Sequence, residues 1–127
     1  MAAITTLTVG NAVADNNSFE SRGLKSFTQI YEATSIPDLK TGAKEQHVCY
    51  AQLTGAMTIN AATVVSRLNQ FDRVVFHFST DATQRIVTFG TNFVSSGTVT
   101  IPASKDATVE GWFDGTNIKI TSREIQA

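Results

Sequence analysis

The sequence predicts an all-β protein, an antiparallel β-sandwich or jelly-roll-like domain of about seven or eight strands with an extended N-terminal arm. Three observations support this fold class. Apolar and polar residues alternate in several short stretches, as side chains do on the two faces of a strand. Turn residues separate these stretches, and Asp114-Gly115 is a strong hairpin signal. Threonine, valine and isoleucine are abundant, whereas leucine, glutamate and lysine are sparse, and this composition favours strands.

Length, charge and cysteine content limit the classes of protein to consider. The chain has 127 residues, enough for one domain with a core, and its net charge is −1. The balanced charge argues against a nucleic-acid-binding protein, which would usually carry a basic excess. Cys49 is the only cysteine, so we expect no internal disulfide and folding in a reducing cytoplasm. We also expect no signal peptide and no membrane span, since no apolar run approaches the roughly 20 residues that a span requires.

The first third of the chain is the least regular part of the prediction. Residues 1–10 are apolar and rich in threonine, which is typical of an extended arm or a first strand. In residues 19–33 the apolar positions have helical spacing, but glycine and β-branched residues favour extended or irregular structure, with a short helix as the alternative. Residues 35–44 contain Pro-Asp and Thr-Gly turn signals and predict a loop. We therefore predict an N-terminal arm and irregular segment over residues 1–45, packing on the same domain or on a neighbouring subunit.

Residues 46–127 carry the predicted β-sandwich domain. In residues 73–79, Val74, Phe76 and Phe78 fall on one face, which predicts a strand with one buried side. The same reasoning, with glycine, proline and polar clusters as boundaries, predicts further strands at residues 47–54, 57–60, 85–90, 98–101, 107–113 and 118–121. Residues 61–72 form either a helical turn or a long connection.

Few residues suggest chemistry. His47 and Cys49 stand two apart and would share one face of a strand, with His77 further along, so a two-ligand metal site is conceivable. The alternative is a packed or surface histidine and a small buried thiol. A Cys–His catalytic pair lacks the sequence context of a nucleophile. The acidic residues are scattered singly, mostly in turns, so a hydrolase with paired carboxylates has little support. We expect no enzyme activity, no cofactor and no metal.

Trp112 and Phe113 are adjacent and must point to opposite faces of their strand. One of them belongs to the core, and the other is available to a second sheet, a neighbouring subunit or a sugar. We expect a core or subunit-interface role, with a sugar site as the alternative.

Four stretches of the chain resemble a β-domain of tailed-bacteriophage virion proteins. They are RVVFHFSTDAT (73–83), RIVTFG (85–90), TVTIPA (98–103) and WFDGT (112–116). Those proteins have a strand followed by QDAT, where this chain has TDAT, and often Lys-Trp after the DGT, where this chain has Asn117-Ile118. The resemblance covers about residues 53–121 and leaves out the N-terminal 45 residues.

The resemblance implies a structural protein of the virion, made in the bacterial cytoplasm and carried on the capsid surface. It implies a homo-oligomer, commonly a trimer, that binds the major capsid protein or another virion protein as a decoration protein. The alternative is a tail-tip or fibre module that recognises a glycan of the host surface. For either role, the residues that we expect at an interface are Ile4, Leu7, Phe19, Phe27 and Trp112.

Overall fold

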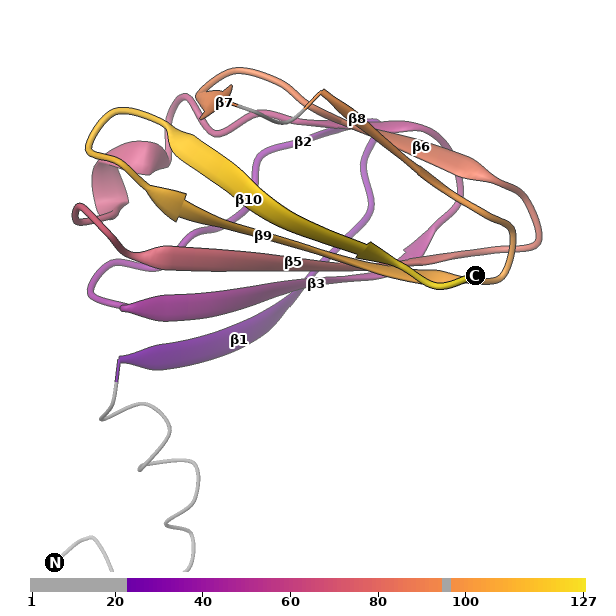
Figure 1. The fold of residues 1–127 in the computed structure, drawn as a ribbon, viewed down its shortest axis with the longest axis horizontal. Coiled ribbons are helices and arrows are strands. Elements are labelled where there is room, and N and C mark those ends of the chain that lie inside the picture. Colours follow the sequence, from indigo (N-terminus) through magenta and orange to yellow (C-terminus); the bar gives the residue numbers. More distant parts are fainter. Residues whose placement is uncertain (1–22, 95–96) are drawn as a thin grey trace, which may run out of the picture.

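Two β-sheets stacked face to face form the body of the protein (Figure 1). The structure is a computed structural model that describes residues 23–94 and 97–127. Sheet A consists, in spatial order, of β1 (Leu24–Gln29), β3 (Glu45–Leu53), β5 (Arg73–Thr80), β9 (Asp106–Phe113), β10 (Ile118–Ile125) and β7 (Phe93–Val94). Sheet B consists of β2 (Thr34–Ser35), β4 (Met57–Ile59), β6 (Arg85–Phe89) and β8 (Thr98–Ile101). One 3-10 turn, η1 (Val65–Arg67), joins β4 to β5, and no α-helix occurs in the described ranges, so the all-β prediction is confirmed.

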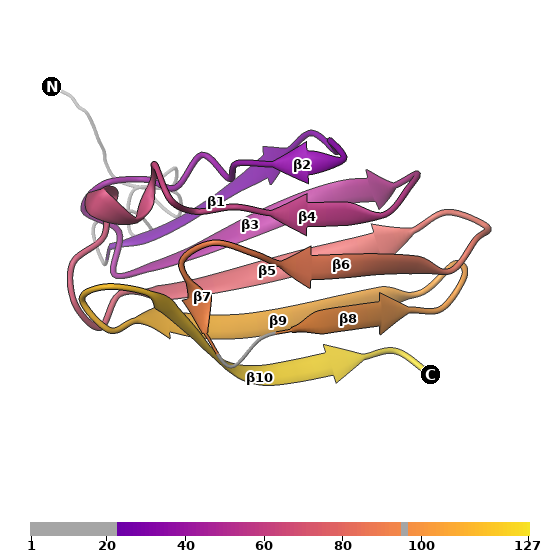
Figure 2. The same cartoon turned by 90° about the horizontal axis from the view of Figure 1, so that it is seen from above.

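The first six strands alternate between the two sheets, and the chain returns each time in the same direction. β1, β3 and β5 are parallel neighbours in sheet A, and β2, β4 and β6 are parallel neighbours in sheet B. Figure 2 shows these successive turns side by side. The arrangement is closer to a short β-solenoid than to the predicted antiparallel sandwich, and it does not match a jelly roll. Alternating side chains reveal the two faces of a strand but carry no information on its partner or direction, which is why the prediction was wrong here.

The last third of the chain reverses direction and is antiparallel, as predicted. β8 pairs with β6, β9 with β5, and β10 with β9, all antiparallel. The turn between β9 and β10 lies at the predicted Asp114-Gly115, where Gly115 has a φ of 106°, a conformation that glycine adopts without steric cost. The short β7 adds to the start of β10 in parallel and closes this side of sheet A over two residues.

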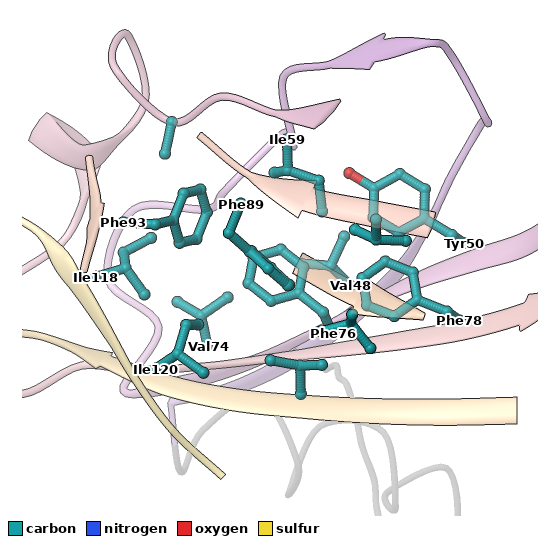
Figure 3. Close-up of a cluster of buried hydrophobic side chains, with 14 of the residues drawn as sticks. Val48, Tyr50, Ile59, Val74, Phe76, Phe78, Phe89, Phe93, Ile118 and Ile120 are labelled. Carbon is teal, nitrogen blue, oxygen red and sulfur yellow. The ribbon is translucent and has the colours of Figure 1, made fainter. Parts of the chain in front are cut away.

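The core fills the space between the sheets (Figure 3). Val48, Phe76 and Val109 stand in one register row across β3, β5 and β9, and all three are completely buried. Phe76 packs edge-on against Phe89 of sheet B and Phe93 of β7, with ring centroids 5.6 and 5.9 Å apart. Burying a phenylalanine stabilises a fold by about 1.5–3 kcal/mol. Phe76 therefore joins the parallel and antiparallel parts of the molecule through one aromatic cluster.

Buried polar side chains hold the parallel turns in place. Gln46 is fully buried, and its amide accepts a hydrogen bond from the Lys40 N–H (2.7 Å) and donates one to the Lys40 carbonyl (3.1 Å). Ser35 of β2 and Tyr50 of β3 share a hydrogen bond of 2.7 Å between their hydroxyls. Burial raises the pKa of Tyr50 to about 12, so the phenol stays neutral and bridges the two sheets.

The described part of the predicted 1–45 segment belongs to this body. β1 lies within residues 19–33, for which the sequence favours extended structure, and β2 ends at Ser35, the first residue of the predicted loop at 35–44. Both strands pair with the strands that follow, so residues 23–45 pack on residues 46–127. The predicted interface residues Ile4, Leu7 and Phe19 lie outside the described residues, as does the predicted arm over residues 1–10.

Candidate functional site

The outer face of sheet A carries charged and ring-bearing side chains that could take part in recognition. Because the core residues of β3, β5 and β9 point inward, their neighbours in sequence point outward. The parallel and antiparallel registers place these outward residues in rows that cross the sheet. One row runs from Leu24 through Glu45, Arg73 and Trp112 to Lys119, and another contains Cys49, His77 and Thr108.

His47 and His77 form the centre of a hydrogen-bonded chain on this face. Nε2 of His47 lies 2.9 Å from Oε2 of Glu45, and Nδ1 of His47 lies 2.8 Å from Nε2 of His77. Nδ1 of His77 lies 3.4 Å from Oγ1 of Thr108. A carboxylate can only accept, so a single proton arrangement satisfies the chain when both rings are neutral: His47 donates to Glu45, His77 donates to His47, and Thr108 donates to His77.

The two histidine rings are stacked and share one hydrogen bond. If both become charged, two N–H donors face each other at stacked rings whose centroids are 5.1 Å apart. The pKa of His77 is lowered by burial and, to a smaller extent, by the charge of His47, while Glu110 acts in the opposite direction. The environment of His77 on the outer face of sheet A therefore disfavours its charged form.

Ion pairs extend this hydrogen-bonded chain of side chains from Glu45 toward one end of the sheet. Arg73 lies between two acids, with Nη1 2.6 Å from Oε1 of Glu110 and Nε 3.5 Å from Oε1 of Glu45. All three side chains are a third to a half exposed, so each pair is worth at most about 1 kcal/mol. Their effect is to fix the positions of side chains on three neighbouring strands.

The geometry gives little support to the metal and Cys–His hypotheses. Cys49 is in register with His77, and both line a shallow hollow of about 280 Å³ together with Ser79, Asp106 and Thr108. Both ring nitrogens of His77, however, are engaged by His47 and Thr108 rather than by the thiol. Across residues 23–94 and 97–127, no group of three or more histidine, cysteine or acidic side chains is arranged to hold a metal ion.

An aromatic platform lies at the end of the sheet where Arg73 stands. Trp112 points outward, as one of the two adjacent aromatics had to, while Phe113 is buried. The ring of Phe71 lies beside it, with centroids 5.6 Å apart, and the ammonium of Lys119 lies 5.9 Å from the indole centroid. Phe71 is 70% exposed, which is unusual for so large an apolar side chain.

The backbone holds Phe71 in an uncommon conformation. Its φ is 75°, a region that bulky residues rarely enter and that often marks a functional constraint. Its N–H donates to the Phe113 carbonyl (2.7 Å), and Asp72 closes the turn by accepting from the Asn69 N–H (2.8 Å). Sequence reasoning missed Phe71, because it lies in the stretch treated as a connection. An apolar residue inside the polar run Asn-Gln-Phe-Asp was the only available signal.

The strands β1 and β2 form an open end of the two sheets. β1 and β2 are the terminal strands of their sheets, so one edge of each has no strand neighbour among the described residues. Phe27, a predicted interface residue, is half-buried on the inner face of β1 with the Lys40 ammonium 4.6 Å from its ring centroid. Ile30 is 80% exposed just beyond β1, and Ile36 is 48% exposed just beyond β2. A hollow of about 390 Å³ next to Phe27 and Ile30 completes this end.

The opposite end of sheet A has a second free edge. β7 covers only Ile118 and Lys119 of β10, which leaves the rest of that strand without a neighbour on its outer side in the part of the chain that the structure describes. Ile125 at the end of β10 is 40% exposed, beside a hollow of about 410 Å³. The predicted residues Phe27 and Trp112 thus do not form one surface: Phe27 belongs to the inner side of the open end, and Trp112 to the outer face of the sheet.

The outer face of sheet B differs from that of sheet A. The registers place Thr34, Thr58, Thr88 and Thr98 in one row across all four strands. Thr34 and Thr98 are exposed and the two central threonines are half-buried. This row presents hydroxyl and methyl groups and no charge.

Comparison with known proteins does not assign the chain to a family: no protein-family model matches it, and no curated protein matches its sequence. Within the described residues, no helix has the length and apolar character needed to cross a membrane.

Proposed function

We propose that this chain is a structural protein of a tailed-bacteriophage virion, which assembles with copies of itself, as trimers, and decorates the outer surface of the capsid. In this role it binds the major capsid protein or another virion protein, stabilises the shell by burying surface across subunit joints, and catalyses no reaction. The proposal needs no cofactor, no nucleic acid and no membrane.

The observation that carries this proposal is the pair of edges on sheet A that have no strand neighbour among the described residues. Edge strands with unpaired backbone groups are templates for pairing with another chain. Here each free edge ends beside an exposed isoleucine, Ile30 at one side and Ile125 at the other. The sequence resemblance over about residues 53–121 supplies the virion context. The hydrogen bonds of His47 with His77 and Glu45 hold these side chains in place on the outer face, a structural role that involves no reaction.

The proposal is tested by mass and by capsid binding. Sedimentation equilibrium of the purified protein should give three times the chain mass of 13.7 kDa at tens of micromolar concentration. The protein should also co-sediment with capsids of its phage that have been stripped of it, and should raise their melting temperature. A monomer that stays in the supernatant when the capsids sediment contradicts the proposal.

A second function, recognition of a host glycan, is favoured by the platform of Phe71 and Trp112. Two neighbouring aromatic faces suit the apolar faces of a sugar ring, and Arg73, Glu110 and Lys119 stand close enough to offer hydrogen bonds. A glycan array probed with the protein and with Trp112→Ala would decide this. Binding that is lost in Trp112→Ala, but kept in the matched variant Phe27→Ala on the inner side of β1, would favour glycan recognition over decoration.

A further inference from the structure

We infer that sheet A continues from one copy of the protein into the next, with β1 of one copy pairing in parallel with the free part of β10 of another. This inference rests on the self-assembly proposed above and names the surfaces that perform it. The partner is a second copy of this chain, and the joint is head-to-tail, so it uses two different edges of each copy.

The direction of the strands makes the two edges compatible. β1 runs parallel to β3 and β5, β9 runs opposite to β5, and β10 runs opposite to β9. β1 and β10 therefore point the same way at opposite ends of one sheet. A second copy that is rotated about the strand direction can therefore place its β1 beside β10 in parallel, as β1 meets β3 within each copy.

The lengths of the two edges also correspond. β1 has six residues, Leu24–Gln29. In β10, Ile120–Ile125 lie beyond the two residues that β7 covers, with a bulge between Ile120 and Ser122 and regular pairing to β9 from Ser122 onward. Each edge thus offers about 20 Å of strand.

Exposed apolar side chains stand at the same end of both edges. Ile30 follows the last residue of β1 and is 80% exposed, and Ile125 ends β10 and is 40% exposed. Since the two strands run the same way, a parallel joint brings these isoleucines to one end of the contact, where the two hollows of about 390 and 410 Å³ also lie. Burying them removes apolar surface from water in both copies.

Few charged side chains stand on the two edges to oppose pairing. β1 has one charged side chain, Lys25, and no proline. Lys25 lies on the inner face of β1 with Phe27, and its ammonium donates to the Thr41 carbonyl of its own chain (3.4 Å). In the free part of β10, Arg123 likewise donates to the Thr98 carbonyl of its own chain (2.9 Å). Both basic side chains are therefore held by their own copy. A head-to-tail joint closes into a ring when its rotation allows, and a ring of three agrees with the proposed trimer.

The backbone provides a sharp test on β1. The Gly23 carbonyl accepts from the Glu45 N–H (3.1 Å), so in a parallel ladder Lys25, Phe27 and Gln29 face β3. The N–H groups of Leu24, Ser26 and Thr28 then face the free edge. Ser26→Pro removes an edge donor without removing a bond inside the copy, and Ser26→Ala is the matched control that keeps the donor.

Native mass spectrometry and sedimentation equilibrium would be used on the full chain. Ser26→Pro and Ile125→Arg should each weaken association by about tenfold or more, whereas Ser26→Ala should not. A mixture of Ser26→Pro, whose β10 edge is intact, with Ile125→Arg, whose β1 edge is intact, should form a dimer with one joint. If Ser26→Pro fails to fold, as judged by circular dichroism, Ile30→Glu replaces it, because Ile30 lies outside the strand.

Two results would overturn the inference and leave the proposed function standing. One is a trimer that survives both Ser26→Pro and Ile30→Glu. The other is a trimer that dissociates only when residues 1–22 are deleted, since that segment would then make the joint. A wild-type chain that is monomeric overturns the inference, and if it also fails to bind capsids, the proposed function falls with it.

Discussion

The three parallel turns, β1 to β6, and the antiparallel remainder, β8 to β10, share one core but are held together differently. In the parallel turns each strand meets its neighbour only after the chain has crossed to the other sheet and back. Buried polar groups such as Gln46 fix those crossings. In the antiparallel part, a tight turn at Asp114-Gly115 fixes the pairing of β9 with β10, because the Asp114 carboxylate accepts from the Thr116 and Asn117 N–H groups. In this protein, the long-range pairing is held by internal polar anchors, whereas the local pairing is held by a turn.

The largest predicted effect tests whether the two parts are one folding unit. Phe76 faces Val48 on the parallel side and Val109 on the antiparallel side. Phe76→Ala should lower the free energy of unfolding by about 3–5 kcal/mol, because it leaves a cavity at the centre of the core. Urea unfolding followed by circular dichroism and by Trp112 fluorescence should still give one coincident transition. Two separate transitions would show that the parallel and antiparallel parts unfold independently, and Thr121→Ala on exposed β10 serves as the neutral control.

A smaller effect is predicted for the polar anchor of the parallel turns. Gln46→Ala removes the side-chain amide that bonds both the backbone N–H and the carbonyl of Lys40, in the connection between β2 and β3. The variant should cost about 2–4 kcal/mol of unfolding free energy. Chemical denaturation measures this loss. Hydrogen exchange of the Lys40 amide should accelerate more than that of β9 amides if the anchor acts locally.

The matched variant is Thr80→Val, at the end of β5, because the Thr80 hydroxyl holds the connection between β8 and β9 in the antiparallel part. Thr80 is buried, and its hydroxyl donates to the Pro102 carbonyl (2.6 Å) and accepts from the Lys105 N–H (3.0 Å). Valine has nearly the same shape, so the expected loss is about 1–2 kcal/mol. A loss larger than that of Gln46→Ala would reverse the comparison between the two parts.

The smallest predicted effect concerns pH and the histidines that cross from β3 to β5. The folded pKa of His77 is lowered from the ordinary value of about 6.5, so the unfolded chain binds more protons just below that pH. Stability should therefore be full above about pH 6.5 and fall by a fraction of 1 kcal/mol as the pH drops toward the lowered value, because His77 is partly exposed.

Melting temperatures measured between about pH 7.5 and 5, with on the order of a few measurements per pH unit, check this prediction. His77→Gln should flatten the curve, and His47→Gln should make it shallower, since the charge of His47 contributes to the shift. The carboxylates Asp38, Asp81 and Asp114 also have lowered pKa values, but their losses begin below about pH 4 and do not overlap this window. If the plot of melting temperature against pH is unchanged in both variants, His47 and His77 do not determine the pH dependence of stability.

The same division explains what the sequence could predict. The antiparallel strands around residues 98–121 were predicted because their boundaries are local: a proline, a turn and Asp114-Gly115. The parallel pairing of β1 with β3 and of β3 with β5 was not predicted, since nothing in a strand announces a partner that lies a full turn of the chain away.

For the candidate site, the outward position of Trp112 followed from its neighbour Phe113. The contact of His47 with His77 did not follow, because it depends on the register between two distant strands. Phe71 was missed because its exposure comes from a backbone conformation, a φ of 75°, that its residue type does not favour.

The central position of β5 has a consequence for how the chain reaches this structure. β5 pairs with β3, which precedes it, and with β9, which follows it, and neither partner is joined to it by a short turn. No hairpin can therefore nucleate the middle of sheet A, and loops on both sides must close before β5 is secured. We expect refolding in milliseconds to seconds rather than microseconds, with the β9–β10 hairpin gaining protection first.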